Sequence, residues 1–180
     1  MWFAQDGELV AFDPDTEKEV RRMAVPDAGA GTAFDGEHLY QLAAGFILVI
    51  RPSDGRVLRS MPGPGKGDDS GMAYADGYLW IGQYRASKIN QVDARIGEVV
   101  KTLSSDRWVT GVSCFGGAVW HATDRGEGRP SELRRLAADG SVTLSSTLPE
   151  GIGVSGLEAA GDGSFWCGGG PSGKLRRVKP

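Results

Sequence analysis

An aromatic residue closes the same short motif five times along this 180-residue chain. The five aromatic residues are 38, 40, 40 and 46 positions apart: Trp2, Tyr40, Trp80, Trp120 and Trp166. A glycine opens a second motif before four of them, at Gly31, Gly71, Gly111 and Gly156. A period near forty residues, rich in β-forming residues and glycine, is typical of a sheet repeated around an axis. We therefore predict an all-β fold, a β-propeller of about five blades.

Each full repeat unit contains four short segments with the composition of β-strands. Glycine turns such as Asp35-Gly36 and Asp76-Gly77 follow the first segment and permit the positive φ of tight hairpins. The third segment carries apolar residues three positions apart: Leu9 and Phe12, Ile47 and Ile50, Ile89 and Val92, Leu133 and Leu136, Leu175 and Val178. This spacing would also suit a helix, but turns bound very short runs, so strands are favoured. We expect four-stranded antiparallel blades.

The five units form a single domain, residues 1–180, divided into 1–30, 31–70, 71–110, 111–155 and 156–180. The chain begins in the second strand of one unit and ends in the third strand of another. We therefore expect incomplete terminal blades. Either the ring closes with one incomplete blade, or two chains complete each other as a homodimer.

Composition narrows the class of partner. The net charge of −3 argues against a nucleic-acid partner, which usually requires a basic surplus. No run of about eighteen apolar residues is present, so we expect no membrane partner. No basic region followed by an apolar stretch opens the sequence, and we expect a cytoplasmic protein unless a leader lies outside it. Cys114 and Cys167 lack metal-site spacing, and we expect neither a metal nor another cofactor.

A binding site is expected where the loops from the fourth to the first strand and from the second to the third strand gather around the axis. The longest polar loops belong to the third, fourth and fifth units. Their candidate substrate-binding residues are Asp69, Gln83, Tyr84, Arg85, Arg107, Trp108 and Thr123. The same loops contain Arg125, Glu127 and the glycine-rich stretch 168–172. Trp108, which we place in a loop outside the repeat, is a candidate wall of a ligand pocket.

One carboxylate interrupts a series of small residues. The position two residues after the repeat glycine holds Ala33, Ala73, Ser113 and Glu158. A carboxylate beside the axis costs free energy unless it is paired, so its presence requires a reason. Glu158 could act as a general acid or base, or hold the ammonium group of a ligand. Alternatively, it caps backbone N–H groups or pairs with an arginine.

His121 occupies a second repeated position, shared with Phe3, Gln41, Ile81 and Cys167. Because two of these residues are plainly apolar, a hydrogen-bonded core histidine is the favoured interpretation. The alternative is a proton carrier paired with Glu158. Cys167 is expected to be a small buried apolar residue.

Residues 71–180 resemble a bacterial family of short propellers described as glutamine cyclotransferase-like. The segments that carry the resemblance include Leu79-Trp80-Ile81-Gly82-Gln83-Tyr84-Arg85, Val119-Trp120-His121-Ala122-Thr123 and Val154-Ser155-Gly156-Leu157-Glu158. The resemblance implies an intramolecular acyl transfer that closes N-terminal glutamine to pyroglutamate, with Glu158 as the proton shuttle. A second resemblance is to the streptogramin lyases, which use histidine, glutamate and magnesium, although this chain has only His38 and His121.

Three functions follow as hypotheses. The first is an enzyme of the glutamine cyclotransferase type that processes a small molecule or a peptide N-terminus through Glu158 and His121. The second is a propeller that binds a ligand or a protein without catalysis, because propellers serve both purposes. The third is a metal-assisted lyase.

Overall fold

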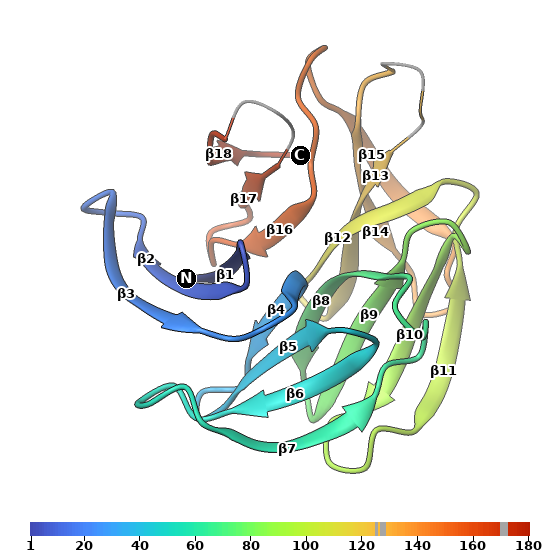
Figure 1. Ribbon diagram of the computed structural model, residues 1–180. Helices are drawn as coiled ribbons and strands as arrows, with labels where there is room; N and C mark the ends of the chain where they lie inside the picture. The colour runs from blue at the N-terminus through green and yellow to red at the C-terminus, as the bar shows by residue number, and fades with distance from the viewer. Residues whose placement is uncertain (125, 127–128, 170–172) are drawn as a thin grey trace.

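The computed structural model describes residues 1–180 except 125, 127–128 and 170–172. The described residues form eighteen strands in five antiparallel sheets, arranged radially around an axis (Figure 1), and no helix. This arrangement confirms the all-β, five-bladed propeller predicted from the repeat. The blades are numbered 1 to 5 along the chain, and the first strand of a complete blade is the innermost.

The three central blades are complete and four-stranded. Blade 2 contains β4 (Ala28–Phe34), β5 (Leu39–Ala43), β6 (Phe46–Ile50) and β7 (Val57–Pro62). Blade 3 contains β8 (Asp69–Ala75), β9 (Tyr78–Gln83), β10 (Lys88–Asp93) and β11 (Val99–Ser104). Blade 4 contains β12 (Trp108–Phe115), β13 (Ala118–Asp124), β14 (Glu132–Leu136) and β15 (Val142–Thr147).

The two terminal blades have three strands each, as expected from the sequence. Blade 1 contains β1 (Trp2–Gln5), β2 (Glu8–Asp13) and β3 (Lys18–Ala24), which correspond to the second, third and fourth strands of a complete blade. Blade 5 contains β16 (Gly156–Ala159), β17 (Phe165–Gly168) and β18 (Arg176–Val178), which correspond to the first three strands of a complete blade. We call the boundary between blades 5 and 1 the seam.

Packing between blades explains why the apolar residues of the third strand are three positions apart. Residues i and i+3 of a strand point to opposite faces of the sheet. In β6, Ile47 packs in the core shared with blade 3, whereas Ile50 packs in the core shared with blade 1. In β10, Ile89 faces blade 4 and Val92 faces blade 2. The third strands of blades 2 and 3 are therefore buried on both faces by their neighbours.

The repeat glycines allow the inner strands to approach one another closely. A Cβ atom added to Gly31 would lie 2.3 Å from the backbone nitrogen of Met72 in the next inner strand. At Gly71 the corresponding distance to the nitrogen of Val112 is 2.4 Å. No side chain fits at either position without displacing backbone, so the glycine motif is a packing requirement of the ring.

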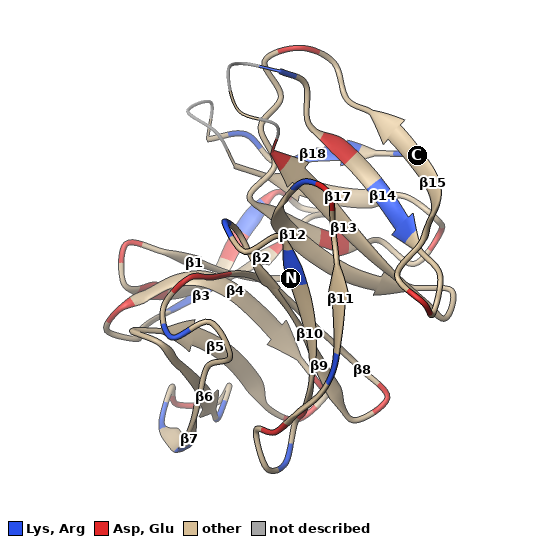
Figure 2. Cartoon of the chain, turned by 90° about the vertical axis from the view of Figure 1, so that its right-hand side faces the viewer, with Lys and Arg blue, Asp and Glu red and all other residues tan. Residues whose placement is uncertain are grey.

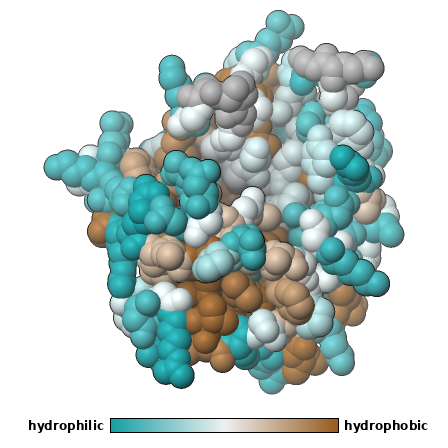
Figure 3. All heavy atoms as spheres, viewed as in Figure 1, coloured by the Kyte–Doolittle hydropathy of each residue, from teal (hydrophilic) through white to brown (hydrophobic). Residues whose placement is uncertain are grey.

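Charged residues lie in the turns and loops and also in several of the strands (Figure 2). One of these strands is β14, which carries both signs in the sequence ELRRL. In the view of Figure 3, hydrophobic residues gather in the lower part of the molecule, where Figure 1 places blade 2. Among the described residues, no helix has the length and apolar character needed to cross a membrane.

Candidate functional site

Glu158 occupies the same structural position as the small residues with which the sequence aligned it. Ala33, Ala73, Ser113 and Glu158 each pair with the repeat aromatic residue of the neighbouring strand. The first three are buried, whereas the side chain of Glu158 is exposed. Protein nevertheless surrounds its carboxyl closely enough that burial raises its pKa, and the N-terminal ammonium opposes this effect. Glu158 can therefore hold or release a proton nearer neutral pH than an ordinary glutamate.

Glu158 is exposed because no described inner strand packs against its side of β16. In the other units this position faces the next blade, because Ala33 packs in the core shared with blade 3 and the Ser113 hydroxyl accepts a 3.0 Å hydrogen bond from the backbone of Ala159. Leu157, which precedes Glu158 in β16, packs in the core shared with blade 4. Since successive residues of a strand face opposite sides, Glu158 faces the seam.

His121 is a core residue between blades 3 and 4. Its side chain is fully buried, and neither ring nitrogen has a side-chain or backbone partner among the described residues. Burial lowers the pKa of His121 to about 4, so the ring is neutral at pH 7. The charged groups that influence its pKa are Arg134, Asp106 and Glu132, not Glu158. The structure therefore does not bring His121 and Glu158 together.

Cys167 shares the position of His121 and is buried against blade 4. Burial raises the pKa of its thiol to about 12. The thiol is protonated at neutral pH, which suits the small apolar residue that the sequence predicted rather than a nucleophile.

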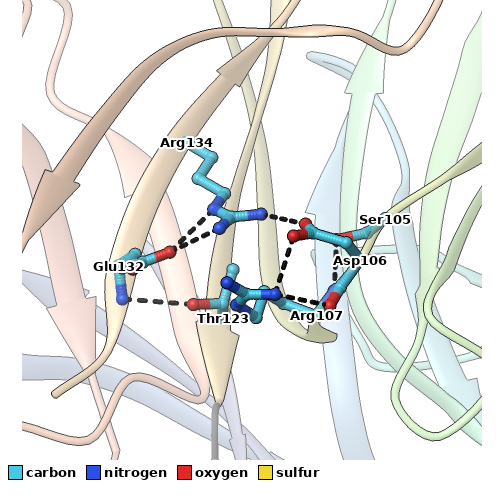
Figure 4. Close-up of polar contacts among 6 residues, drawn as sticks. All are labelled: Ser105, Asp106, Arg107, Thr123, Glu132 and Arg134. Atoms are coloured by element: carbon cyan, nitrogen blue, oxygen red, sulfur yellow. Dashed lines mark hydrogen bonds and ion pairs between the residues drawn. The ribbon is translucent and has the colours of Figure 1, made fainter. Parts of the chain in front are cut away.

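Arg107 and Thr123 belong to a charged network that the sequence did not reveal (Figure 4). At its centre, the buried guanidinium of Arg134 lies 2.6 Å from the carboxylate of Glu132 and also pairs with Asp106. Arg107 lies 2.7 Å from the same Asp106 carboxylate. The Thr123 hydroxyl accepts a 3.2 Å hydrogen bond from the backbone N–H of Glu132. Two of the predicted substrate-binding side chains are thus held by the protein itself.

Tyr84 and Trp108 form an aromatic pair between blades 3 and 4. Their ring centroids are 5.2 Å apart, and the Tyr84 hydroxyl donates a 2.6 Å hydrogen bond to Asp124. This hydrogen bond, with burial, raises the pKa of Tyr84 to about 12. The prediction that Trp108 lies in a loop is wrong, because it is the first residue of β12 and pairs with Asp124. The indole is 41% exposed.

Asp69 and Gln83 pair at the ends of β8 and β9. Asp69 accepts a 2.9 Å hydrogen bond from the backbone N–H of Gly65, and the Gln83 amide also hydrogen-bonds to its carboxylate. The second carboxylate oxygen of Asp69 is buried and has no partner among the described residues. Burial raises the pKa of Asp69. Asp69 also borders a pocket of about 270 Å³ whose walls include Leu42, Ala43 and Phe46.

The remaining predicted residues are placed as follows. Arg85 is exposed in the turn between β9 and β10. Arg125 and Glu127 lie outside the described residues, as do residues 170–172 of the glycine-rich stretch. No group of three or more His, Cys, Asp or Glu side chains in the described part of the chain could hold a metal ion.

A larger pocket, of about 380 Å³, opens at the opposite ends of the strands between blades 2 and 3. Tyr40 and Tyr74 line it with nearly parallel rings, their centroids 6.0 Å apart. The Tyr40 hydroxyl donates a 3.0 Å hydrogen bond to Asp35, which also accepts from the backbone N–H of His38. The sequence analysis did not identify this pocket, because its polar contacts are those of an ordinary hairpin turn.

This chain is similar to known proteins in its three-dimensional structure and not in its sequence. No family model and no curated protein sequence matches this chain. The crystal structure of Myxococcus xanthus glutaminyl cyclase is similar, with a TM-score of 0.75 and 18% identity over 97% of this chain and 82% of that chain. The resemblance inferred from the sequence is thus supported as a structural likeness alone.

Two lyase structures are also similar. Streptogramin B lyase has a TM-score of 0.59 and 18% identity over 88% of this chain and 57% of that chain. Virginiamycin B lyase from Staphylococcus aureus has a TM-score of 0.60 and 14% identity over 99% of this chain and 66% of that chain. This chain spans less than two thirds of either lyase. At such identities, the likeness shows the shared propeller fold and not a shared activity.

Proposed function

We propose that this propeller processes the N-terminal end of a peptide or a similar small molecule by an intramolecular acyl transfer of the glutaminyl cyclase type. The observation that carries the proposal is Glu158, a solvent-accessible carboxyl on an innermost strand whose pKa is raised by burial. A proton carrier needs both accessibility and a pKa displaced toward the working pH. The structural likeness to a glutaminyl cyclase supports the choice of reaction.

The reaction assigns Glu158 two transfers. The α-amino nitrogen of an N-terminal glutamine attacks its own side-chain carboxamide carbon, and a C–N bond forms. The ionised Glu158 accepts the proton that the amine loses and then delivers it to the departing amide nitrogen. The C–N bond to that nitrogen breaks, ammonia leaves, and the carboxylate is restored. The exposed faces of Trp108 and Arg85 are candidate contacts for the rest of the peptide.

The test uses a synthetic peptide that begins with glutamine and follows the loss of ammonia by mass spectrometry. The same peptide with an acetylated α-amine cannot cyclise and serves as the substrate control. Glu158→Gln should lower turnover by about 100-fold or more, the usual contribution of general acid–base catalysis. Glu98→Gln is the matched variant, since this exposed carboxylate lies in a turn at the opposite ends of the strands. Absence of turnover by the unmodified chain on any such peptide would refute the cyclase proposal.

A second candidate, a propeller that binds a ligand without catalysis, is favoured by one observation. On the face of the propeller where the predicted binding loops gather, the polar side chains already interact with the protein itself. Arg107 forms an ion pair with Asp106, Thr123 accepts a hydrogen bond from Glu132, and Tyr84 donates one to Asp124. Rigid side chains of this kind suit recognition, because little conformational entropy is lost on binding. This function predicts that peptide binding, measured by calorimetry, survives Glu158→Gln and that no product forms. The described residues offer no donor cluster that would favour the metal-assisted lyase.

A further inference from the structure

Two exceptions to the repeat meet at the interface between blades 2 and 3. The aromatic residue of the second strand is tryptophan in four units and tyrosine in one, at Tyr40. Tyr74 is the one tyrosine at a position of the first strand that otherwise holds Phe34, Cys114 and Ala159. The two tyrosine rings stack, with centroids 6.0 Å apart and planes 10° apart. Where the other units place a larger indole, this interface has a phenol and a pocket of about 380 Å³.

The tyrosine pair gives this pocket an aromatic wall with one free hydroxyl. Tyr40 is buried in the core shared by blades 2 and 3, and Tyr74 packs against the same core while staying partly exposed. The Tyr40 hydroxyl donates its proton to Asp35. The Tyr74 hydroxyl has no hydrogen-bond partner among the described residues. It can therefore donate a hydrogen bond to a ligand that lies against the ring.

Arg59 of β7 places a fixed cation in the wall of the same pocket. Its Nη1 donates a 2.8 Å hydrogen bond to the carbonyl of Arg95, and its Nη2 donates a 2.7 Å hydrogen bond to the carbonyl of Ala94. The outermost strands of two other blades make the same kind of contact with the next blade: Arg21 with the carbonyl of Ser53, and Lys101 with that of Ala138. In the described part of the chain, no carboxylate pairs with Arg59, so its charge is not neutralised by the protein.

The guanidinium of Arg59 keeps two donors for a ligand. It has five N–H groups, and three of them are used by the carbonyls of Ala94 and Arg95 and by the sulfur of Met61, which lies 2.9 Å from Nη1. The Nε–H and one Nη2–H have no partner among the described residues. These two groups lie side by side along one edge of the guanidinium plane and match the two oxygens of a carboxylate. A lysine, such as Lys101 at the equivalent position of blade 3, offers no such pair.

The acidic residues of the pocket limit the charge that a ligand can carry. Asp35 accepts hydrogen bonds from the backbone N–H groups of Glu37 at 2.8 Å and His38 at 2.6 Å, besides that from Tyr40. Burial alone would raise the pKa of Asp35, but these hydrogen bonds outweigh it and lower the pKa, so Asp35 is ionised at neutral pH. The carboxylate of Asp35 is thus already bound within its own turn, and its charge repels a dianion. A ligand with a single negative charge, placed on Arg59, fits this arrangement better than a phosphate.

We propose that this pocket binds a planar aromatic carboxylate, with its ring against Tyr74 and its carboxylate on the free edge of Arg59. Aromatic rings in contact stabilise one another beyond the burial of their surface. A volume of about 380 Å³ lies within the range of small-molecule sites. The pocket is at the ends of the strands opposite the loops that carry the predicted substrate-binding residues. The proposal therefore goes beyond the proposed function and does not depend on it.

The probe for the experiment is 2-naphthoate, titrated into the ¹⁵N-labelled full chain and followed by the shifts of its backbone amides in NMR spectra. We expect saturable shifts at residues that line the pocket, such as Leu58, Gly77 and Arg95. The expected Kd is about 1 mM or lower, as is usual for a ligand of this size. Two control compounds should each bind at least about tenfold more weakly: 2-naphthamide, which lacks the charge, and cyclohexanecarboxylate, which lacks the aromatic ring.

Arg59→Lys in the full chain is the decisive variant. Because Lys101 makes the equivalent contact with the next blade through its ammonium group, Arg59→Lys should keep a Tm close to that of the unmodified chain. Its affinity for 2-naphthoate should fall at least about tenfold, because an ammonium group cannot supply two parallel donors. Arg56→Lys is the matched control, since Arg56 is exposed and lies outside the pocket, and its affinity should be unchanged. Tyr74→Phe removes only the hydroxyl and should lower the affinity by about two- to tenfold.

Three results would overturn the proposal. The first is equal affinity of 2-naphthoate for the unmodified chain and for Arg59→Lys. The second is a titration of the unmodified chain without saturable shifts at the amides that line the pocket. The third is tighter binding of 2-naphthyl phosphate or of 2-naphthylmethylamine than of 2-naphthoate, because the pocket would then select a different charge. Each readout is binding or stability, so its result is independent of any turnover on glutamine peptides.

Discussion

Replacing Arg134 tests how much the charged network between blades 3 and 4 contributes to the stability of the fold. The Arg134 side chain is 8% exposed and that of its partner Glu132 is 10% exposed, whereas Asp106 is 64% exposed. Arg134→Ala removes the cation of the buried Arg134–Glu132 pair. Breaking a buried ion pair from one side costs about 3–5 kcal/mol. The exposed contact to Asp106 adds at most about 1 kcal/mol.

The assay is equilibrium unfolding in urea, followed by tryptophan fluorescence. With an m-value of about 2 kcal/mol/M, the loss would lower the urea midpoint by about 2 M. Arg135→Ala is the matched control, because this neighbouring arginine is exposed and should cost no more than about 0.5 kcal/mol. The double change Glu132→Leu with Arg134→Met should recover much of the stability, since apolar residues of similar size replace buried pairs well. Equal midpoints for Arg134→Ala and Arg135→Ala would refute the reasoning.

Three further predictions concern single residues. His121→Leu should leave stability unchanged or raise it by up to about 2 kcal/mol in urea unfolding at pH 7, because two buried ring nitrogens without partners among the described residues are removed. The pKa of His121 in the folded protein is about 4, below its ordinary value of 6.5. The stability that the neutral ring contributes is therefore fully present above pH 6.5 and is lost as the pH falls toward 4. This sensitivity of the stability to acid should be weaker in His121→Leu. Tyr84→Phe should cost about 0.5–1.5 kcal/mol and, in a titration followed by difference absorbance, should remove one of the tyrosines that ionise near pH 12, leaving Tyr40. Gly71→Ala should lower Tm by several degrees, because its Cβ would lie 2.4 Å from the backbone nitrogen of Val112, and a Tm unchanged in a thermal melt would contradict the close approach.

The repeat predicts the fold because the same packing problem recurs in each blade. Glycine at the start of the first strand, an aromatic residue in the second and paired apolar residues in the third each satisfy one contact with a neighbouring blade. Ile47 and Ile50 illustrate the point, since their spacing is readable from the sequence but its reason, burial on both faces, requires the neighbouring blades. Local periodicity thus specified the blades and their number.

The contacts of the candidate site were less predictable, because they join residues far apart in the sequence. Arg134 pairs with Asp106, 28 positions away, and no local pattern indicates that partner. The alternation of Glu132 and Arg134 on one strand was the available signal, since both side chains face the same side. Trp108 was assigned to a loop because it precedes the repeat motif, whereas pairing with Asp124 extends β12 back to include it.

Glu158 shows how a repeat identifies an exception before its cause is known. The small residues at this position in blades 2, 3 and 4 are imposed by the next inner strand, which leaves no space for a longer side chain. At the seam no described inner strand packs on this face of β16, so the steric constraint is absent and a glutamate would fit even without a catalytic role. The Glu158→Ala variant distinguishes a glutamate that merely fits at this position from one that transfers a proton in the reaction. If the side chain is only tolerated, Glu158→Ala keeps the turnover of the unmodified chain on glutamine peptides, and if it carries the proton, turnover falls by about 100-fold or more while the urea midpoint stays unchanged.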